Sequence, residues 1–168
     1  HTGVFGVGGD LAFERTVVVL PSGDASVMDG AGREDVFPSD GAGGWTSPAG
    51  IFSTLVQNPD STFTLTTPGG TRYQHDASGY LVSVSDKAQN TCAIQRNASH
   101  EITKIIDTQD RAYLVTFSTV AGLRVITKLQ DFLGREVVYT YDATTGDLLK
   151  VRSPVVTGDP NGNNFPNG

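Results

Sequence analysis

Cysteine is almost absent from this sequence of 168 residues, with Cys92 as its only example. One cysteine cannot build a disulfide framework within the chain or supply a cysteine-based zinc site. Long apolar runs are also missing: the longest aliphatic stretch is Val17–Leu20, far short of the ~20 residues that a membrane-spanning helix needs. The sequence therefore predicts neither a disulfide scaffold nor a membrane-spanning segment.

Positive charge is scarce as well, with 12 Lys and Arg against 18 Asp and Glu and a net charge of −6. Nucleic-acid binding needs a basic stripe that displaces counterions from phosphates. No run of Lys or Arg is present, which argues against nucleic acid and against an anionic membrane surface. The chain opens on His1 with no visible signal peptide, so we expect a processed product, a recombinant fragment or a piece of a longer protein.

Strand and turn formers dominate what is present. The chain has 20 Gly and 8 Pro, with abundant Thr, Ser, Val and Asp. Short β-forming runs between turn signals predict eleven or twelve strands and no significant helix. We expect an all-β fold, an antiparallel β-meander of hairpin repeats that forms a segment of a rolled or spiral sheet. Residues 30–50 are predicted to be a long glycine-rich excursion.

The stretch "REVVYTYDATTGDLLKV" at 135–151 has counterparts earlier in the chain. "YQHDASGYLVSV", which begins at Tyr73, aligns with it after one inserted residue, and the stretch that begins at Arg111 aligns without a gap. An Asp, three residues and then Arg or Asn introduce each unit at 86, 107 and 131. Such regular spacing indicates internal repeats. The positions expected to carry the repeat are Tyr73, His75, Asp76, Gly79, Leu81, Arg111, Phe117, Gly122, Gly134, Arg135, Tyr139, Tyr141, Asp142, Gly146, Leu148 and Val151.

One unit has a simple physical design. The period of two along a strand places Val137, Tyr139 and Tyr141 on one face. Asp142 can hold the turn as an Asx-turn, and Gly146 can adopt the positive φ that the turn needs. We expect the aromatic and aliphatic positions to form the sheet and the Asp and Gly positions to form its turns.

The pattern Gly-Arg-x3-Tyr-x-Tyr-Asp-x3-Gly-x-Leu-x2-Val at 134–151 resembles a YD repeat. Such repeats occur in bacterial Rhs proteins, in the C components of ABC toxin complexes and in animal teneurins. The resemblance implies a β-ribbon that spirals into a hollow shell, which in the toxins holds a toxic domain. His75 and Phe117 replace the second Tyr, and Ser118 replaces the Asp. Neither the family's protease core nor a toxin domain is visible, so its enzymatic parts do not transfer to this chain.

The resemblance divides the chain into one all-β YD-repeat domain and a tail. The domain covers 1–157, with degenerate repeats over 8–70 and clearer repeats over 71–154, and the tail covers 158–168. The resemblance implies a non-catalytic module of a secreted or cell-surface bacterial protein that needs no cofactor. Its partners would be further repeats of the same protein or copies of itself. A self-assembling extracellular subunit joined through strand edges or termini is the alternative, and a small secreted hydrolase is a third.

Several residues suggest chemistry but have a simpler interpretation. Cys92 and His100 resemble a thiol and its base, yet no third orienting group is evident, and a packed cysteine beside an exposed turn histidine fits better. His75 next to Asp76 resembles a base with its carboxylate, but the alignment places His75 in the aromatic position of the repeat. Trp45 with the repeat tyrosines could form a sugar-binding platform, although such aromatics more often stack within a sheet.

Two further sites concern ligands and modification. Asp159, Asn161 and Asn163 have the spacing of the first half of a calcium loop, but the later Gly and Glu are missing, so a flexible turn is the simpler expectation. Asn97 begins the tripeptide "NAS", an acceptor for N-linked glycans in a glycosylating host. A glycan is therefore a conceivable partner, and no metal is expected.

Overall fold

The computed structural model describes residues 2–7, 9, 11–158, 161–162 and 164–166. The strands are β1 (Thr2–Gly3), β2 (Gly6–Val7), β3 (Thr16–Val19), β4 (Ala25–Met28), β5 (Glu34–Phe37), β6 (Thr54–Gln57), β7 (Phe63–Thr66), β8 (Arg72–His75), β9 (Leu81–Ser85), β10 (Thr91–Arg96), β11 (Ile102–Ile106), β12 (Ala112–Val120), β13 (Leu123–Gln130), β14 (Glu136–Tyr141) and β15 (Leu148–Arg152). No described residue lies in a helix. The predicted all-β class is confirmed.

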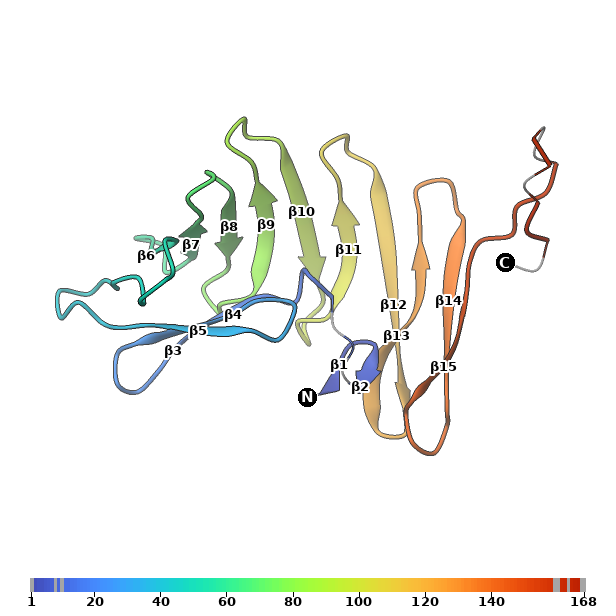
Figure 1. Ribbon diagram of the computed structural model, residues 1–168, viewed down its shortest axis with the longest axis horizontal. Helices are drawn as coiled ribbons and strands as arrows, with labels where there is room; N and C mark the ends of the chain where they lie inside the picture. The colour runs from blue at the N-terminus through green and yellow to red at the C-terminus, as the bar shows by residue number, and fades with distance from the viewer. Residues whose placement is uncertain (1, 8, 10, 159–160, 163, 167–168) are drawn as a thin grey trace.

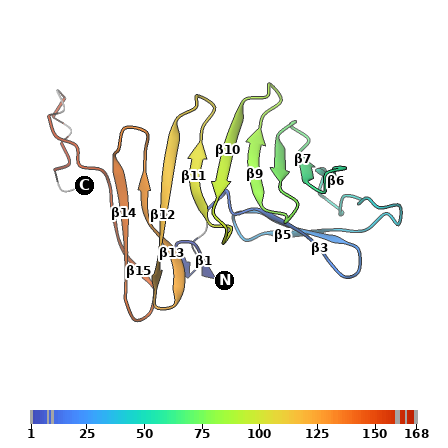
Figure 2. The same ribbon diagram turned by 180° about the vertical axis from the view of Figure 1, so that it is seen from behind.

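The strands form three antiparallel sheets (Figure 1). The largest is a ten-stranded meander from β6 to β15, in which every strand pairs with its neighbours in sequence. The three-stranded sheet β3–β5 runs across the strands of the large sheet, near the turn between β8 and β9, and Figure 2 shows the same crossing from behind. The β1–β2 hairpin lies beside the β12–β13 end. Within the described residues, no helix is long and apolar enough to cross a membrane.

Most hairpin turns share one geometry, built around a leading Asp or Asn. In the turn at 131–135, one carboxylate oxygen of Asp131 accepts hydrogen bonds of 2.9 Å from the amides of Leu133 and Arg135. The fourth residue, Gly134, has a φ of 78°. Asp and Asn satisfy turn amides in this way, and the left-handed position favours Gly. A side-chain oxygen accepts the same two amide hydrogen bonds in the turns led by Asp29, Asp40, Asp76, Asp86, Asn97 and Asp107.

The predicted role of Asp142 is confirmed, because its carboxylate accepts hydrogen bonds from the amides of Thr144 and Thr145. Gly146 has the expected positive φ, at 79°. The turn between β12 and β13 is tighter, with positive φ at both Ala121 and Gly122. That pair of angles is typical of a two-residue hairpin. The sequence therefore sets the turns through local hydrogen bonding.

Residues 30–50 are only partly the loop that was expected. Strand β5 lies within this range and pairs with β4 along its whole length. Its Phe37 is buried, with 1% of its surface exposed, and this burial stabilises the strand although two of its four residues are acidic. The prediction was wrong here because the glycines around β5 masked a strand. The chain also forms the short strands β1 and β2, which were not predicted.

The core is made of two clusters along the large sheet. The first joins the small sheet to β6 and β7 through Val17, Ala25, Val27, Phe37, Leu55, Phe63 and Leu65. The second comprises Leu81, Ile94, Ile102, Val115 and Ile126 on β9 to β13. Tyr73 on β8 packs against both clusters. One face of the large sheet is thus covered by the small sheet at one end and by the N-terminal residues farther along.

Candidate functional site

The N-terminal segment before β3 is fastened to the large sheet by Arg96. The Arg96 guanidinium donates hydrogen bonds of 2.9 Å to the Glu14 carboxylate and to the carbonyl oxygen of Phe13. It also donates to the carbonyl oxygens of Leu81 and His100. Only 6% of the Arg96 side chain is exposed. The buried guanidinium fixes the path of the segment, because moving the segment away would separate it from the Glu14 carboxylate and the Phe13 carbonyl oxygen.

A second fastening lies nearer the N-terminus. The amide of Ile126 on β13 donates a hydrogen bond of 2.7 Å to the carbonyl oxygen of Val4. The ring of Phe5 packs on the ring of Tyr139, with centroids 5.0 Å apart. Together with Arg96, these contacts hold the chain over β10 to β14.

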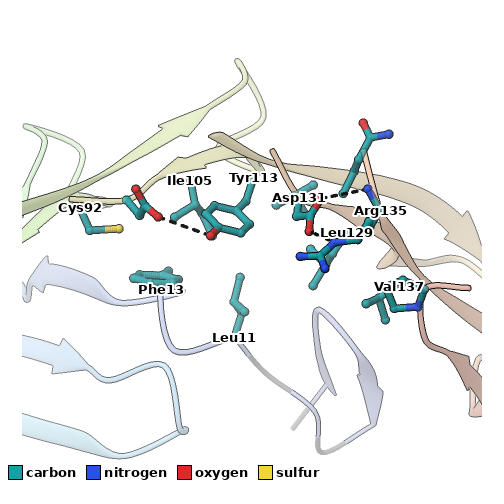
Figure 3. Close-up of a pocket in the computed structure, with 13 residues that line it drawn as sticks. Leu11, Phe13, Cys92, Ile105, Tyr113, Leu129, Asp131, Arg135 and Val137 are labelled. Atoms are coloured by element: carbon teal, nitrogen blue, oxygen red, sulfur yellow. Dashed lines mark hydrogen bonds and ion pairs between the residues drawn. The ribbon is translucent and has the colours of Figure 1, made fainter. Parts of the chain in front are cut away.

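An apolar pocket of about 520 Å³ lies between this segment and the sheet. Figure 3 shows Leu11 and Phe13 on one side and side chains of β10 to β14 on the other. The lining residues are Leu11, Phe13, Cys92, Ile105, Asp107, Tyr113, Val115, Leu129, Gln130, Asp131, Arg135, Val137 and Pro154. The volume and apolar lining are those of a small-ligand pocket.

The charged groups of this pocket are already paired. The Asp131 carboxylate accepts a hydrogen bond of 2.6 Å from the Arg135 guanidinium. The Asp107 carboxylate binds Arg111 at 2.7 Å, and the Tyr113 hydroxyl lies 3.4 Å from the same oxygen. Because each carboxylate has its own cation and turn amides, neither is poised to take a proton from a bound molecule. The pocket is suited to holding an apolar group.

Cys92 lines this pocket, but its environment disfavours nucleophilic chemistry. Burial raises the pKa of the Cys92 thiol, and the nearby Asp107 carboxylate raises it further. A thiol with a raised pKa stays protonated at neutral pH and reacts slowly. His100 is an exposed turn residue with a φ of 62°, and its ring stacks on Tyr80 at 4.0 Å instead of serving a thiol.

The structure places the predicted repeat residues on strands and in turns. The strand positions are Tyr73 and His75 on β8, Leu81 on β9, Phe117 on β12, Tyr139 and Tyr141 on β14, and Leu148 and Val151 on β15. The turn positions are Asp76, Gly79, Arg111, Gly122, Gly134, Arg135, Asp142 and Gly146. Leu148 and Val151 do not belong to the core: they are 41% and 49% exposed, because β15 has a neighbour on one side only.

Four hairpins share a one-residue shift in cross-strand register. Tyr139 pairs with Val151 and Tyr141 with Leu148, with a register shift between Thr140 and Tyr141. In the β8–β9 hairpin, Tyr73 pairs with Val84 and His75 with Leu81, again with a shift just before the second position. The β12–β13 hairpin shifts between Thr116 and Phe117, and the β10–β11 hairpin between Gln95 and Arg96. Arg96 therefore occupies the position that His75, Phe117 and Tyr141 hold in the other three hairpins.

The remaining predicted sites are not brought together. Trp45 packs against the first core cluster, whereas Tyr139 packs against the second, so the aromatics form no common platform. Asp159 and Asn163 lie outside the described residues, and Asn161 is exposed. The described part of the chain contains no group of three or more His, Cys, Asp or Glu side chains placed to hold a metal ion. The side-chain amide of Asn97 donates to Glu101 at 2.8 Å, so the glycan-accepting nitrogen is engaged in its turn.

Sequence reasoning missed the residues that attach the N-terminal segment. Phe5, Glu14 and Arg96 are far apart in sequence, and no local pattern links them. Arg96 alone carried a signal, because it occupies the aromatic position of a hairpin and precedes a turn led by Asn97. No family model matches the chain, and a search of curated proteins finds no significant relative.

Proposed function

We propose that this chain is a non-catalytic structural module of a secreted or cell-surface Rhs/YD-repeat protein, where it forms part of a shell or scaffold. The observation that carries the proposal is the one-residue register shift that recurs in four hairpins along one ten-stranded meander. Repeating supersecondary units bury their faces against their neighbours, and an array of them makes an extended wall. The Tyr-x-Tyr-Asp pattern in the sequence supports the same family.

The edges of the large sheet fit this role. Among the described strands, β6 pairs only with β7 and β15 only with β14. All five residues of β15 are exposed, including Leu148, Leu149 and Val151. An edge strand with free amides and carbonyls and apolar side chains readily pairs with another strand. A further hairpin at β15 would cover these groups and continue the wall.

The non-catalytic part of the proposal rests on the pocket chemistry. The acids at the pocket rim are each paired with an arginine, and its thiol has a raised pKa. Hydrolysis requires an activated nucleophile or a free acid and base in one cleft. The paired acids and the protonated thiol are compatible with a sheet surface that binds apolar groups and catalyses no reaction.

The experiment that tests the module extends the sheet by one hairpin. The chain would be cut after Arg152 and continued with a second copy of residues 131–152. The turn at 131–135 would then follow β15, as it follows β13 in the unchanged chain. We expect the amides of β15 to become protected from hydrogen exchange and the free energy of unfolding to rise. The control adds the same residues in scrambled order. Unchanged exchange in β15 with the native hairpin would contradict the proposal, because this edge would then not accept a repeat.

A second candidate function is a self-assembling extracellular subunit, and the strand count of the large sheet favours it. The sheet has ten strands, so β6 and β15 run in opposite directions. A second copy placed head to tail would bring its β6 beside β15 with the antiparallel alternation preserved. Such a contact does not close on itself and would give a filament. Analytical ultracentrifugation over a range of concentrations tests this: association that Val151→Pro abolishes supports the filament, and a monomer at every concentration contradicts it.

A further inference from the structure

His75 is a buried titratable residue at the junction of the two core clusters. It is the last residue of β8 and pairs with Phe63 of the first cluster and with Leu81 of the second. Only 1% of its surface is exposed. Neither ring nitrogen makes a hydrogen bond with the described residues. Buried polar atoms are seldom left without partners, so this imidazole needs an explanation.

The junction around His75 is also where the small sheet meets the large one. The amide of Val17 on β3 donates a hydrogen bond of 2.8 Å to the carbonyl oxygen of Gly79, and the amide of Leu81 donates one of 3.2 Å to that of Arg15. A Cβ atom at Gly79 would overlap the carbonyl oxygen of Val17. The contact is thus close, made by backbone groups and sealed from solvent.

The charges near His75 do not favour a second positive charge. Arg15, which precedes β3, acts on the imidazole with a like charge once His75 is protonated. The adjacent Asp76 charge raises the pKa of His75, although its carboxylate also accepts hydrogen bonds from the amides of Ser78 and Tyr80. The flanking strands β7 and β9 face His75 with Phe63 and Leu81, which carry no charge. Backbone groups of Tyr73 and Phe63 also raise the pKa of His75, but burial outweighs them, so a protonated His75 is costly in the closed form.

We propose that His75 is a proton-sensitive latch: its protonation releases the sheet β3–β5 from the β7–β9 part of the large sheet. Because His75 is buried, an imidazolium ion regains water only if the two layers separate. Separation breaks the two backbone hydrogen bonds at the junction and opens the first core cluster, which β3–β5 share with β6 and β7. The second cluster lies under the N-terminal segment and is not divided by this movement.

The direction of the pH dependence follows from the imidazole's surroundings. Burial lowers the pKa of His75 from 6.5 to about 4, and the charge of Arg15 contributes to the shift. The closed form therefore binds fewer protons than the open one, so its advantage is complete above pH 6.5 and is lost as the pH falls toward 4. Between about pH 7.5 and about pH 4.5, linkage shifts the equilibrium toward the open form about 70-fold.

Trp45 is a built-in reporter of this movement. It follows β5, its indole N–H donates a hydrogen bond of 2.9 Å to the carbonyl oxygen of Gly23, and its ring lies 6.1 Å from that of Phe63 on β7. It is the only tryptophan in the chain. Separation of the layers would carry Trp45 away from Phe63 and into water, which shifts its emission to longer wavelength.

The test follows the full chain between pH 7.5 and pH 4.5 by Trp45 emission and by hydrogen exchange of the β4 amides, corrected for intrinsic rates. We expect protection of β4 to fall about 70-fold while the amides of β12 and β13 stay protected. His75→Phe places at this position the residue found at Phe117 and should abolish the pH dependence. His100→Gln is the matched control, because Gln89 occupies the equivalent turn position with a φ of 67°.

Three results would overturn the latch. One is the same acid transition in His75→Phe, and another is equal loss of protection in β4 and β12, which would mean global unfolding. If His75→Phe does not fold, NMR titration of the imidazole in the unchanged chain decides the question. A His75 pKa close to 6.5 would then refute the latch, and a depressed pKa coupled to chemical-shift changes in β3 and β4 would support it.

Discussion

The Tyr141 hydroxyl on β14 donates a hydrogen bond of 2.6 Å to the carbonyl oxygen of Ile126 on β13. The amide of the same Ile126 donates to Val4, outside the large sheet. The β13–β14 pairing ends at Lys128 and Val138, so Ile126 lies beyond it. The Tyr141 hydroxyl thus supplies a hydrogen-bond donor to a carbonyl oxygen that β14 backbone does not reach. Its aromatic ring is buried, with 8% of its surface exposed. The second aromatic position of the hairpin therefore contributes both packing and a specific hydrogen bond.

Replacing Tyr141 separates these two contributions. Tyr141→Phe should lower the free energy of unfolding by about 1–2 kcal/mol, because it leaves a buried carbonyl oxygen without a donor. Tyr141→Ala should cost about 3–5 kcal/mol, because it also removes a buried ring. Urea denaturation measures both. Tyr139→Phe is the control, since the Tyr139 hydroxyl makes no hydrogen bond with the described residues; a loss as large as that of Tyr141→Phe would contradict the assignment.

Tyr141 also predicts the alkaline limit of stability. Burial raises the pKa of Tyr141 from 10.0 to about 12, and Tyr139 adds to the shift. The folded state therefore holds this proton more tightly than the unfolded state does. Stability from this group is complete below pH 10 and is lost as the pH rises to 12, by roughly 3 kcal/mol at most. Urea midpoints across this range should fall more steeply for the unchanged chain than for Tyr141→Phe, and parallel curves would refute the prediction.

Gly79 is expected to tolerate no side chain. Its φ is 86°, and an added Cβ would overlap the carbonyl oxygen of Val17. Gly134 has a similar φ of 78° but open space around it. Gly134→Ala should therefore cost only the strain of a left-handed residue, about 1 kcal/mol, and Gly79→Ala should cost clearly more. Denaturation of the two variants compares them directly, and equal losses would show that β3 moves aside readily.

The hydrogen bonds of Arg96 should dominate the attachment of the N-terminal segment before β3. Arg96→Ala removes four hydrogen bonds of a buried guanidinium, including its ion pair with Glu14, and should cost about 3–5 kcal/mol. Limited proteolysis near Phe13 should accelerate at the same time. Arg124→Ala removes an ion pair with Glu101 whose arginine side chain is 49% exposed, so it should change stability little. If Arg96→Ala is cleaved near Phe13 at the same rate as the unchanged chain, the contacts of Phe5 and Val4 are enough to hold the segment.

The turn carboxylates should make the protein sensitive to strong acid. The amides of Thr145 and Thr144 lower the pKa of Asp142, and those of Ala42 and Gly44 lower the pKa of Asp40. Stability from these groups is present above the ordinary carboxyl pKa and is lost as the pH falls through the lowered value. Asp142→Asn retains an acceptor oxygen for the turn and should flatten this acid response, whereas Asp142→Ala should weaken the hairpin at neutral pH. If Asp142→Asn denatures in acid like the unchanged chain, the turn bonds are not responsible.

The turns were the most predictable part of the fold, because Asp, Asn and Gly act on the backbone within a few residues. The missed strand β5 obeys the same rule: Asp29, Gly32 and Arg33 lead into it as Asp131, Gly134 and Arg135 lead into β14. Its acidic residues and glycine-rich surroundings hid that signal. The formation of β5 depends on the burial of Phe37 in the first core cluster. A pattern of neighbouring residues cannot predict that burial, because the other members of the cluster come from other strands.

The pocket and the latch position were beyond sequence reasoning for a different reason. Both depend on the chain before β3 returning to cover the large sheet, and the contacts that fix this path join residues distant in sequence, such as Glu14 and Arg96. His75 was placed correctly on a strand, in an aromatic position. Its lack of hydrogen-bond partners became apparent only with the packing of β3.

The order of the strands has a mechanical consequence. Within the large sheet, every strand pairs only with its neighbours in sequence. Tension applied between the two ends of the sheet would therefore load one hairpin at a time, so the sheet would lengthen stepwise by peeling. The bonds from Val17 to Gly79 and from Arg96 to Phe13 tie β3 and the segment before it across this line of peeling. The middle strands would thus yield last, and the protein would behave as an extensible strip with a reinforced centre.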